Sequence, residues 1–446
     1  MKKIIIILGL LLSYTISAQE NYSFTLQEAI DFALENNRTA KNAAQDIEAA
    51  KHQKWETTAT GLPQIEASID YNNWLKQQVS LIPAEFFGGN PGEFAEIAFG
   101  TKQTMNATAT IKQLLFDGSY LVGLQSAKVF LEISKNAKEK TDLEVRKAVI
   151  NAYGNVLLAE ESIKILEKNK AVLEKNLDET TKIYENGLEE EESVEQLQIT
   201  LSGIESSLNN TSRLKALAYQ MLNITLGLDI SDTTKLTDSL DLLTSQNIVL
   251  SLLEAKNDIE NTIDYKIAEN AKRSKELLLK LEKTKALPSL NAFVNGSYAG
   301  NSNNFDFLDK EQKWFGSSLL GVSMNIPIFS SLGRSAATQR AKINLEKSKN
   351  DLTETEQKLK LQIAQAKSNY QFSIEDYENK KQNLSLAERI EQKNETKFFE
   401  GIASSFELRQ AQTQLYASQQ DYLQAMLDVI TNKAELETLL NNVSIN

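Results

Sequence analysis

Several chemically useful residues are missing from this sequence of 446 residues, which contains no cysteine and a single histidine, His52. Without cysteine the chain has no disulfide, no thiolate nucleophile, no cysteine-bound zinc and no N-terminal cysteine that could carry a lipid. A metal site or a Ser-His-Asp triad would have to use the one imidazole. We therefore expect neither an enzyme active site nor a bound metal or cofactor.

Positive charge is the minority charge in this chain. The sequence has 48 Lys and Arg against 60 Asp and Glu, which gives a formal net charge of −12. Binding to nucleic acid needs clustered lysine and arginine to neutralise the phosphates. The composition therefore argues against a nucleic-acid partner.

Long apolar runs are scarce, and the clearest one lies at the N-terminus. Two lysines are followed by the apolar stretch Ile4–Leu12 and later by the small residue Ala18, the pattern of a secretory signal peptide. No later stretch reaches about 18 apolar residues, the length that a transmembrane helix needs. We expect residues 1–18 to be a signal peptide and the rest to contain no transmembrane helix.

The prolines fall in two clusters, Pro63, Pro83 and Pro91, then Pro288 and Pro327. Proline inside a helix costs about 3 kcal/mol, so the proline-free tracts 92–287 and 328–446 permit very long helices. Apolar residues recur in both tracts in alternating steps of three and four, the seam of antiparallel coiled-coil packing. The predicted helices are residues 119–186, 193–226, 335–400 and 404–440. At 1.5 Å per residue the first would be about 100 Å long.

Beside the prolines the apolar period changes to two. Ile65, Ala67, Ile69 and Tyr71 alternate with polar neighbours, as expected for a strand that is apolar on one side only. The predicted strands are residues 63–71, 104–115, 288–298 and 314–328. Each has about ten residues, enough for a tilted strand to cross a bilayer.

The two halves of the sequence follow the same order of helix, strand, strand, long helix, glycine loop and helix. Gly187 and Gly401 occupy equivalent places after the long helices, where a left-handed residue would end a helix. We therefore divide the mature chain into a first repeat, residues 19–227, and a second repeat, residues 228–446.

Four strands per chain create a problem of assembly. The smallest membrane barrels have about eight strands, and in lipid every strand edge must be paired. Several copies must therefore pool their strands: two copies would give a filled barrel, and three would give twelve strands and a lumen. Polar residues on one strand face favour the larger number, but the residues alone leave both open.

Three segments carry a pattern that spans both halves of the chain. They are TLQEAIDFALENNRTAKNAAQDIEAAKHQKWETTATGLPQIEASIDY near the N-terminus, LLFDGS at a strand-to-helix junction, and FFEGIASSFELRQAQTQLYASQQDYLQAMLDVITNKAELETLL near the C-terminus. Together they resemble the TolC family of outer-membrane efflux proteins. The resemblance covers essentially the whole mature chain, in the same order in both halves.

The resemblance implies a fold that is mainly α with a β-barrel contribution. Long antiparallel coiled-coil helices and four membrane strands per protomer would assemble as a homotrimer, with a barrel in outer-membrane lipid and a helical tube in the periplasm. The implied partners are a periplasmic adaptor protein and an inner-membrane pump. The protein would be a passive exit duct for drugs, toxins or proteins in a tripartite efflux or type I secretion system.

The resemblance also points to the inner mouth of the tube. Counting from Gly401, the acidic positions that close the family's channels fall on Glu407 and Gln410, so only one of the two is a carboxylate here. Three Glu407 side chains around a symmetry axis would attract cations. The alternative is an ordinary exposed helix carboxylate, and the sequence leaves both open.

The helix turnarounds are candidate contacts for the adaptor. The candidate residues are Gly187, Glu189, Glu190, Glu191, Glu192 and Gly401. The alternative is a solvated loop whose acidic side chains favour the positive end of the following helix.

The connection 72–103 is long and apolar, and its glycines and prolines predict irregular structure. We expect it to lie outside the cell and to fold over or into the barrel mouth. The plug candidates are Phe86, Phe87, Phe94 and Phe99. Trp74 and Trp314, near strand ends, are candidates for an aromatic girdle at the lipid–water interface, the alternative being packing within loops. The second loop, residues 300–313, is polar and should be solvated.

Two other classes of protein fit parts of the sequence. A secreted coiled-coil scaffold or adhesin would explain the helices but not the amphipathic strands, and solubility without detergent would favour it. An enzyme is the weakest alternative, because the chain has no cysteine, one histidine and no catalytic signature.

Overall fold

The computed structural model of the protein describes residues 21–255 and 258–442, so the predicted signal peptide, residues 1–18, lies outside the described part. The chain forms two compact units. A helical unit comprises the described residues of Met1–Glu48, Ile133–Glu269 and Asn350–Asn446, and a strand-containing unit comprises Ala49–Glu132 and Asn270–Lys349. Each unit takes segments from both predicted repeats, so the two-repeat division of the chain stays a prediction.

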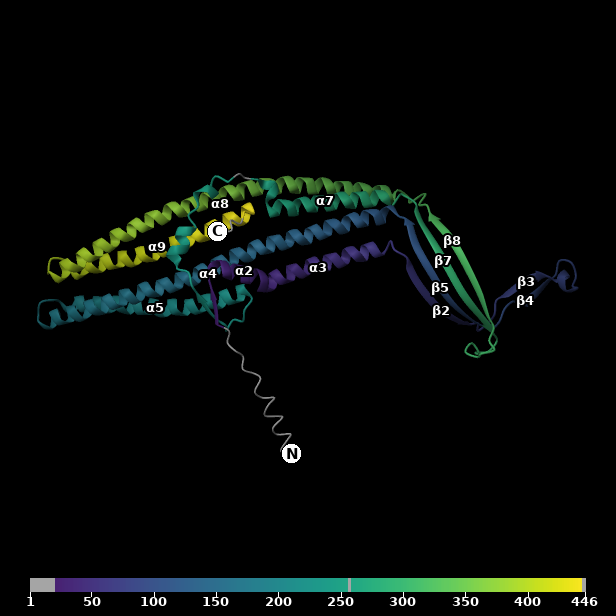
Figure 1. Ribbon diagram of the computed structural model, residues 1–446, viewed down its shortest axis with the longest axis horizontal. Helices are drawn as coiled ribbons and strands as arrows, with labels where there is room; N and C mark the ends of the chain where they lie inside the picture. The colour runs from purple at the N-terminus through teal and green to yellow at the C-terminus, as the bar shows by residue number, and fades with distance from the viewer. Residues whose placement is uncertain (1–20, 256–257, 443–446) are drawn as a thin grey trace, which may run out of the picture. The chain divides into compact units, whose positions relative to one another are not determined.

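Long helices make up most of the chain (Figure 1). They are α2 (Leu26–Asn36), α3 (Arg38–Ala59), α4 (Gly118–Glu185), α5 (Glu191–Leu226), α6 (Leu240–Gln246), α7 (Ile263–Thr284), α8 (Gly333–Phe399) and α9 (Ser405–Leu440). The helical unit also contains the short turns η2 (Leu250–Leu252) and η3 (Ile259–Asn261) and a parallel pair of strands, β1 (Asn21–Phe24) and β6 (Thr233–Leu236). Within residues 21–255 and 258–442, no helix combines the length and the apolar character needed to cross a membrane.

The core of the helical unit surrounds Tyr153 of α4, whose side chain is fully buried. Its hydroxyl lies 3.0 Å from the carbonyl oxygen of Phe24 and 3.0 Å from the carboxylate of Asp238, and its one hydrogen is shared between these two acceptors. Burial raises the pKa of Tyr153, so the hydroxyl stays a donor. Apolar residues of α2, α4, α5, α6, α8 and α9 pack around this point, Leu222 and Val429 among them.

Both helical hairpins, α4–α5 and α8–α9, reverse direction through a left-handed glycine. The φ angle is 74° at Gly187 and 73° at Gly401. At the second turn the amide of Ile402 donates to the carbonyl of Lys397 at 2.8 Å, the Schellman arrangement that ends a helix. The glycine caps expected from the sequence are therefore confirmed.

The strand-containing unit is built on an antiparallel sheet in the order β2-β5-β7-β8. Its strands are β2 (Gln64–Asn73), β5 (Gln103–Phe116), β7 (Ser289–Ser302) and β8 (Trp314–Asn325). Directly paired residues point to the same side of a sheet, so the row Tyr71, Met105, Gly300 and Trp314 marks one face. The predicted strand 314–328 is three residues too long, because Pro327 has no N–H for a strand ladder.

The expectation of irregular structure over residues 72–103 is wrong. β3 (Val79–Pro83) and β4 (Phe94–Ala98) form a separate two-stranded antiparallel sheet, joined by the turn η1 (Ala84–Phe87). The glycines that argued against regular structure lie in the turn, where Gly88 has a φ of 82° and ends η1. Pro83 is the last residue of its strand, where a missing N–H is tolerated.

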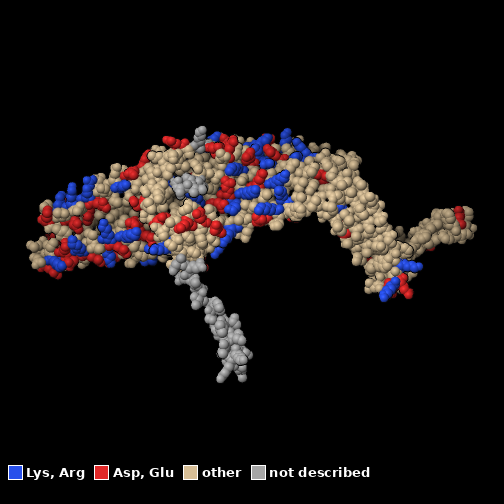
Figure 2. Space-filling view, viewed as in Figure 1, with Lys and Arg blue, Asp and Glu red and all other residues tan. Residues whose placement is uncertain are grey.

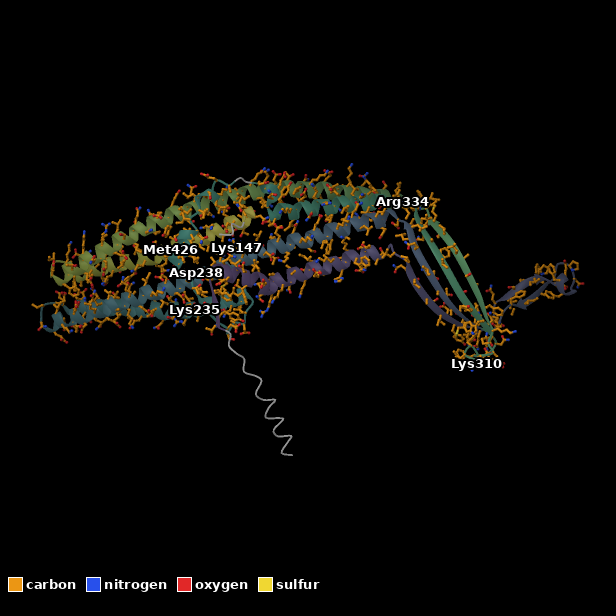
Figure 3. All side chains as sticks on the ribbon, viewed as in Figure 1. Lys147, Lys235, Asp238, Lys310, Arg334 and Met426 are labelled. Atoms are coloured by element: carbon orange, nitrogen blue, oxygen red, sulfur yellow. The ribbon has the colours of Figure 1, made fainter. Side chains whose placement is uncertain are left out.

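The loop between β7 and β8, predicted to be polar and solvated, contains a buried aromatic residue. Phe307 is 3% exposed, and its ring packs edge-on against Tyr71 with centroids 6.0 Å apart. The loop is charged in its second half, where Lys310 lies (Figure 3). The other residues of 301–313 are exposed or partly exposed, as predicted, and only Phe307 departs from the expectation, because two phenylalanines among polar residues give no periodic signal.

The sheet joins the long helices through two different turns. Before α4, the carboxylate of Asp117 accepts from the amides of Ser119 at 2.6 Å and Tyr120 at 3.1 Å, as an N-cap does. Before α8, Leu332 is left-handed with a φ of 62°, and the guanidinium of Arg334 donates to the carbonyl of Pro327 at 2.8 Å (Figure 3). Arg334 therefore stabilises a turn with left-handed backbone at Leu332, and no pattern in the sequence predicts this conformation.

Candidate functional site

One face of the four-stranded sheet is apolar and exposed. Together with Tyr71 and Trp314 it carries Ile65, Ile69, Ile111, Val294, Tyr298, Leu320, Val322 and Met324. Ile65 is 73% exposed and Leu320 is 74% exposed. On the side seen in Figure 2, the helices carry many charged side chains and the sheet carries few. An exposed apolar surface of this extent marks a place of contact with another apolar phase or protein.

The opposite face of the sheet is mainly polar, with Phe315 and Leu319 of β8 as its exposed apolar residues. One row across it consists of Ser68, Thr108, Ser297 and Ser317. In the next row the amide of Asn295 donates to the hydroxyl of Thr110 at 2.9 Å, and Lys112 forms an ion pair with Glu66 at 2.9 Å. This face is built to contact water.

The two edges of the sheet are open. β2 and β8 are the edge strands, and no strand within the described residues pairs with their outer sides. The free N–H and C=O groups of an edge are a template for a further strand. The sheet is therefore suited to continue into strands of another chain.

Aromatic side chains gather at one end of the apolar face. The ring of Trp314 lies 6.4 Å from Phe307, and Phe305 lies 5.5 Å from Tyr71. Trp74 follows the last residue of β2 and is 48% exposed. The girdle role of both tryptophans stays a prediction, and the sequence analysis did not predict that Phe307 packs against Trp314 and Phe305 against Tyr71.

The hairpin β3–β4 exposes its aromatic side chains. Phe86, Phe87, Phe94 and Phe99 are each more than 60% exposed. A two-stranded hairpin is marginally stable in water, and this one lacks a cover for its apolar residues among the described part of the chain. The plug role stays a prediction.

Each helical turnaround places an apolar side chain in the open directly after its glycine. Leu188 follows Gly187 and is 78% exposed, and Ile402 follows Gly401 and is 70% exposed. Sequence reasoning selected the glycines but missed these two neighbours. The acidic residues of the first turnaround follow Leu188. Glu189 accepts a hydrogen bond from the hydroxyl of Ser193 at 2.6 Å, and Glu192 accepts one from the side-chain amide of Gln196. Glu190 is the N-cap of α5, and Glu191 is the first residue of that helix.

Glu407 has a structural task at the start of α9. Its carboxylate accepts from the amide of Ser404 at 2.8 Å, and the hydroxyl of Ser404 accepts in turn from the amide of Glu407 at 3.3 Å. These bonds form a capping box and hold the pKa of Glu407 below its usual value. The spacing Ser404-x-x-Glu407 signals this cap in the sequence, but the gate interpretation obscured it. Gln410 is exposed on the next turn.

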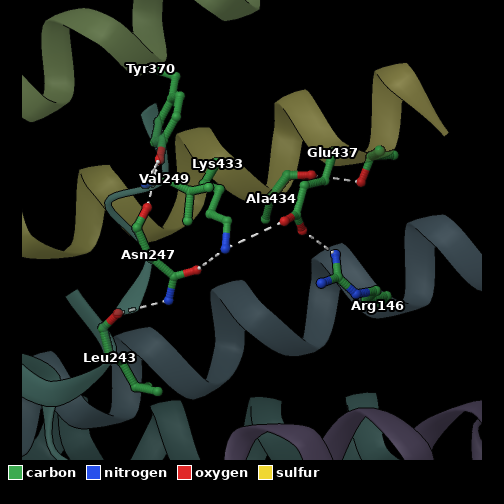
Figure 4. Close-up of polar contacts among 9 residues, drawn as sticks. Arg146, Leu243, Asn247, Val249, Tyr370, Lys433, Ala434 and Glu437 are labelled. Carbon is green, nitrogen blue, oxygen red and sulfur yellow. Dashed lines mark hydrogen bonds and ion pairs between the residues drawn. The ribbon is translucent and has the colours of Figure 1, made fainter. Parts of the chain in front are cut away.

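A buried charged network joins α4, α9, α8 and the chain after α6 (Figure 4). Arg146 forms an ion pair with Glu437 at 2.8 Å, and Lys433 lies 3.4 Å from the same carboxylate and donates to Asn247 at 3.0 Å. The hydroxyl of Tyr370 donates to the carbonyl of Asn247 at 2.6 Å. We call this set the Arg146 network. Its members lie up to 291 residues apart, so no local sequence pattern reveals it.

A second polar group, in which two amide side chains are buried and two carboxylates are partly exposed, lies nearer the turnarounds, between the two hairpins. Asn176 of α4 donates to Glu395 of α8 at 3.1 Å, while Gln412 of α9 lies beside Glu391. Burial, and then the charge of Glu395, raise the pKa of Glu391. We call these four residues the Glu391 cluster. Asn176 and Gln412 occupy positions of the apolar seam, which is the sequence signal that was overlooked.

Neither polar group resembles a catalytic centre. Across residues 21–255 and 258–442, no three side chains of His, Cys, Asp or Glu lie close enough together to hold a metal ion. The features that distinguish this molecule are surfaces and helix ends.

Comparison with known proteins agrees with this architecture. The sequence pattern of the family described as outer membrane efflux protein matches residues 29–228 and 268–442. A protein described as outer membrane protein TolC, from Vibrio cholerae, is 22% identical over 433 residues, which cover 94% of this chain and 91% of the relative.

Solved structures with the same fold are also known. Crystal structures of CusC match with a TM-score of 0.75 and 19% identity over 93% of this chain and 91% of the other. The outer membrane protein VceC from Vibrio cholerae matches with a TM-score of 0.71 and 14% identity over 93% and 95%. The predicted fold class and outer-membrane location are thus confirmed, and the chain belongs to the family of outer membrane efflux proteins.

Proposed function

We propose that three copies of this chain form a passive exit duct. Their pooled strands make a twelve-stranded β-barrel in the outer membrane, and their long helices make a tube in the periplasm. The observation that carries the proposal is the four-stranded sheet with one exposed apolar face, one polar face and two open edges.

The chemistry of the sheet supports this assembly. In lipid every backbone group of a strand must be paired, and four strands are too few to close on themselves. If β8 of one copy pairs with β2 of the next, no edge remains. The apolar face then contacts lipid, and the row of Ser68 and Ser317 faces a water-filled lumen.

The absence of cysteine makes the assembly directly testable. Ser317→Cys on β8 is combined with cysteines placed in turn on the polar face of β2, beginning with Ser68→Cys. After oxidation, at least one pair should give covalent trimers on a denaturing gel. Thr108→Cys with Ser297→Cys is the matched control, because these residues pair within one chain and should cross-link without raising the mass. If every edge pair stays monomeric and the protein is soluble without detergent, the scaffold alternative is favoured.

The periplasmic partners are expected at the helix turnarounds. An adaptor protein would contact Leu188 and Ile402, with the acidic residues Glu189–Glu192 beside them, and would connect the tube to an inner-membrane pump. The duct would then belong to a tripartite efflux or type I secretion system. Leu188→Asp should abolish co-purification with the adaptor and leave the trimer intact. Tyr184→Asp, at an exposed residue of the last turn of α4, is the control.

The gate proposal rests on Glu407, with the uncharged Gln410 on the next turn. Around a threefold axis, three Glu407 carboxylates held by their caps would attract cations. Glu407→Lys should lower the affinity of multivalent cation blockers in planar bilayers. Unchanged block would remove Glu407 from the gate.

The hairpin β3–β4 is proposed to cover the outer mouth of the barrel. The amide of Trp74 donates to the carbonyl of Lys102 at 2.9 Å, so the chain segments that enter and leave the hairpin are already held together by a backbone hydrogen bond. Deleting residues 80–98 should therefore leave the barrel intact and raise single-channel conductance or antibiotic entry. Unchanged values would reject the plug.

A further inference from the structure

The Glu391 cluster combines two carboxylates with buried oxygen atoms that have no partner. Asn176 is 0% exposed and Gln412 is 1% exposed. The Oδ1 atom of Asn176 and both polar side-chain atoms of Gln412 lack a hydrogen bond to any described residue. The amide of Gln412 lies near enough to Glu391 to offset part of the rise in its pKa, but completes no hydrogen bond.

Buried polar groups in proteins are almost always hydrogen-bonded, so these atoms require an explanation. The carboxylates add to the problem, because Glu391 and Glu395 lie one helical turn apart on α8. The groups that shift the pKa of Glu391 are burial, Glu395 and Gln412, and they include no lysine or arginine. The cluster therefore combines two neighbouring carboxylates with buried amide oxygens that have no partner.

We propose that the Glu391 cluster binds a hard divalent cation, Ca²⁺, between the two helical hairpins. Glu391 and Glu395 supply the charged ligands, and the side-chain oxygens of Gln412 and Asn176 supply neutral ones. Ca²⁺ accepts carboxylate and amide oxygens in a flexible geometry. The Asn176 amide now presents its nitrogen to Glu395, so binding the ion requires a half rotation that replaces this hydrogen bond by contacts of the Asn176 oxygen and the Glu395 carboxylate with the ion.

Two carboxylates balance the charge of one divalent ion. Their number also explains why the cluster does not resemble a usual metal site, which would gather three or more acidic or histidine side chains. Thr180, one turn beyond Asn176 on α4, is fully buried and its hydroxyl is also without a partner, so it is placed to bind a ligand water.

The effect of Ca²⁺ on the channel rests on the proposed duct function, whereas the binding of Ca²⁺ to the cluster does not. The ion would join α4 to α8 and α9, and so fasten the two hairpins near their turnarounds. Removal of Ca²⁺ should loosen the periplasmic mouth. Ca²⁺ would then regulate the same mouth at which Glu407 is proposed to act.

The test uses Tb³⁺ as a luminescent substitute for Ca²⁺ on the purified full chain. Tyr416 lies close enough to Glu391 and Glu395 for both charges to act on it, so it should transfer excitation to the bound ion. Saturable emission that Ca²⁺ displaces is expected. Glu391→Gln with Glu395→Gln should weaken Ca²⁺ binding at least tenfold. Tyr416→Phe should reduce the emission and leave the affinity for Ca²⁺ unchanged.

The matched control is Glu375→Gln with Glu378→Gln, an exposed acidic pair on the same helix. It should bind Ca²⁺ as the unaltered chain does. Equal binding by the unaltered chain and the Glu391/Glu395 double variant would overturn the site, as would the absence of saturable binding. Binding is measured without a membrane, so a chain that binds Ca²⁺ but forms no channel would contradict the duct and leave the site intact.

Discussion

The helical unit contains two polar groups that lie between the same helices, but only one of them pairs all of its charged and polar side chains. In the Arg146 network the side chains of Glu437, Lys433 and Arg146 are 2%, 7% and 13% exposed, and each charge has a partner of opposite sign. In the Glu391 cluster two carboxylates share one helix, and the amide of Gln412 is unpaired. Both groups connect α4, α8 and α9.

This contrast indicates which part of the helical unit is held in a single arrangement. A buried ion pair adds little net stability, but breaking it is expensive, so a complete network selects one arrangement of its helices. An incomplete cluster weakens the packing around it until something supplies the missing partner. The hairpins are therefore fastened at the Arg146 network and adjustable at the Glu391 cluster.

The largest effect is expected from opening the complete network. Glu437→Ala leaves Arg146 and Lys433 buried without their partner and should lower the free energy of unfolding by about 3–5 kcal/mol. Denaturant unfolding measures this. Glu435→Gln, which removes the half-exposed partner of Lys147, is the control and should cost at most about 1 kcal/mol. If Glu437→Ala lowers the free energy of unfolding by less than about 1 kcal/mol, the Arg146 network does not hold the helices more firmly than the Glu391 cluster does.

A substitution of opposite sign should follow at the incomplete cluster. Gln412→Leu replaces an unpaired amide by an apolar side chain of similar size, and in Ca²⁺-free buffer it should stabilise the chain by about 1–3 kcal/mol. Asn247→Leu makes the same change inside the complete network and should destabilise by a similar amount. If thermal or denaturant unfolding shows that both substitutions stabilise the chain, or that both destabilise it, the Arg146 network and the Glu391 cluster do not differ in the way described.

The pH dependence of stability should separate the two groups further. Because the pKa of Glu391 is raised in the folded chain, its charged form opposes folding above that pKa, and the penalty disappears below the unfolded value of about 4.3. Glu391→Gln should therefore raise the melting temperature at pH 7 with EDTA present, by less than Gln412→Leu does. The gain should vanish near pH 4, and a gain that persists there would exclude titration as its cause.

The smallest expected effect concerns the cap of α9, two turns from Gln412. Ser404→Ala removes the hydroxyl of the capping box and should cost about 1 kcal/mol. Hydrogen exchange should become faster over residues 405–412 and stay unchanged around Lys433, if the two groups are independently stable. Faster exchange at both places would show that they unfold as one.

The main features of the fold could be predicted because they depend on local patterns. The long helices at Gly118–Glu185 and Gly333–Phe399 begin and end within two residues of the predicted ranges 119–186 and 335–400. The absence of proline and the regular apolar spacing were sufficient to predict the bounds of these two helices. The four strands of the larger sheet were predicted from their apolar period of two. The family resemblance supplied the fold class and the outer-membrane location.

The features that escaped prediction depend on contacts between distant residues or on short segments. Arg146 meets Glu437 only in the folded chain. The strands β3 and β4, of five residues each, were too short for their alternation to outweigh the neighbouring glycines. The Ser404 cap can be recognised from its spacing to Glu407 alone, whereas the polar residues at seam positions can be recognised only once the coiled-coil register is known.

The predominantly two-residue alternation along β2, β5, β7 and β8 means that the position of a residue in its strand decides which face of the sheet it joins. A single inserted residue would exchange the apolar and polar faces for the whole remainder of that strand, whereas two inserted residues would restore them. The turn at residues 88–93 lies outside these four strands. Tags or epitopes placed there should leave the chain able to assemble, while one extra residue in the middle of β2, whose pairing is uninterrupted, should be enough to prevent it.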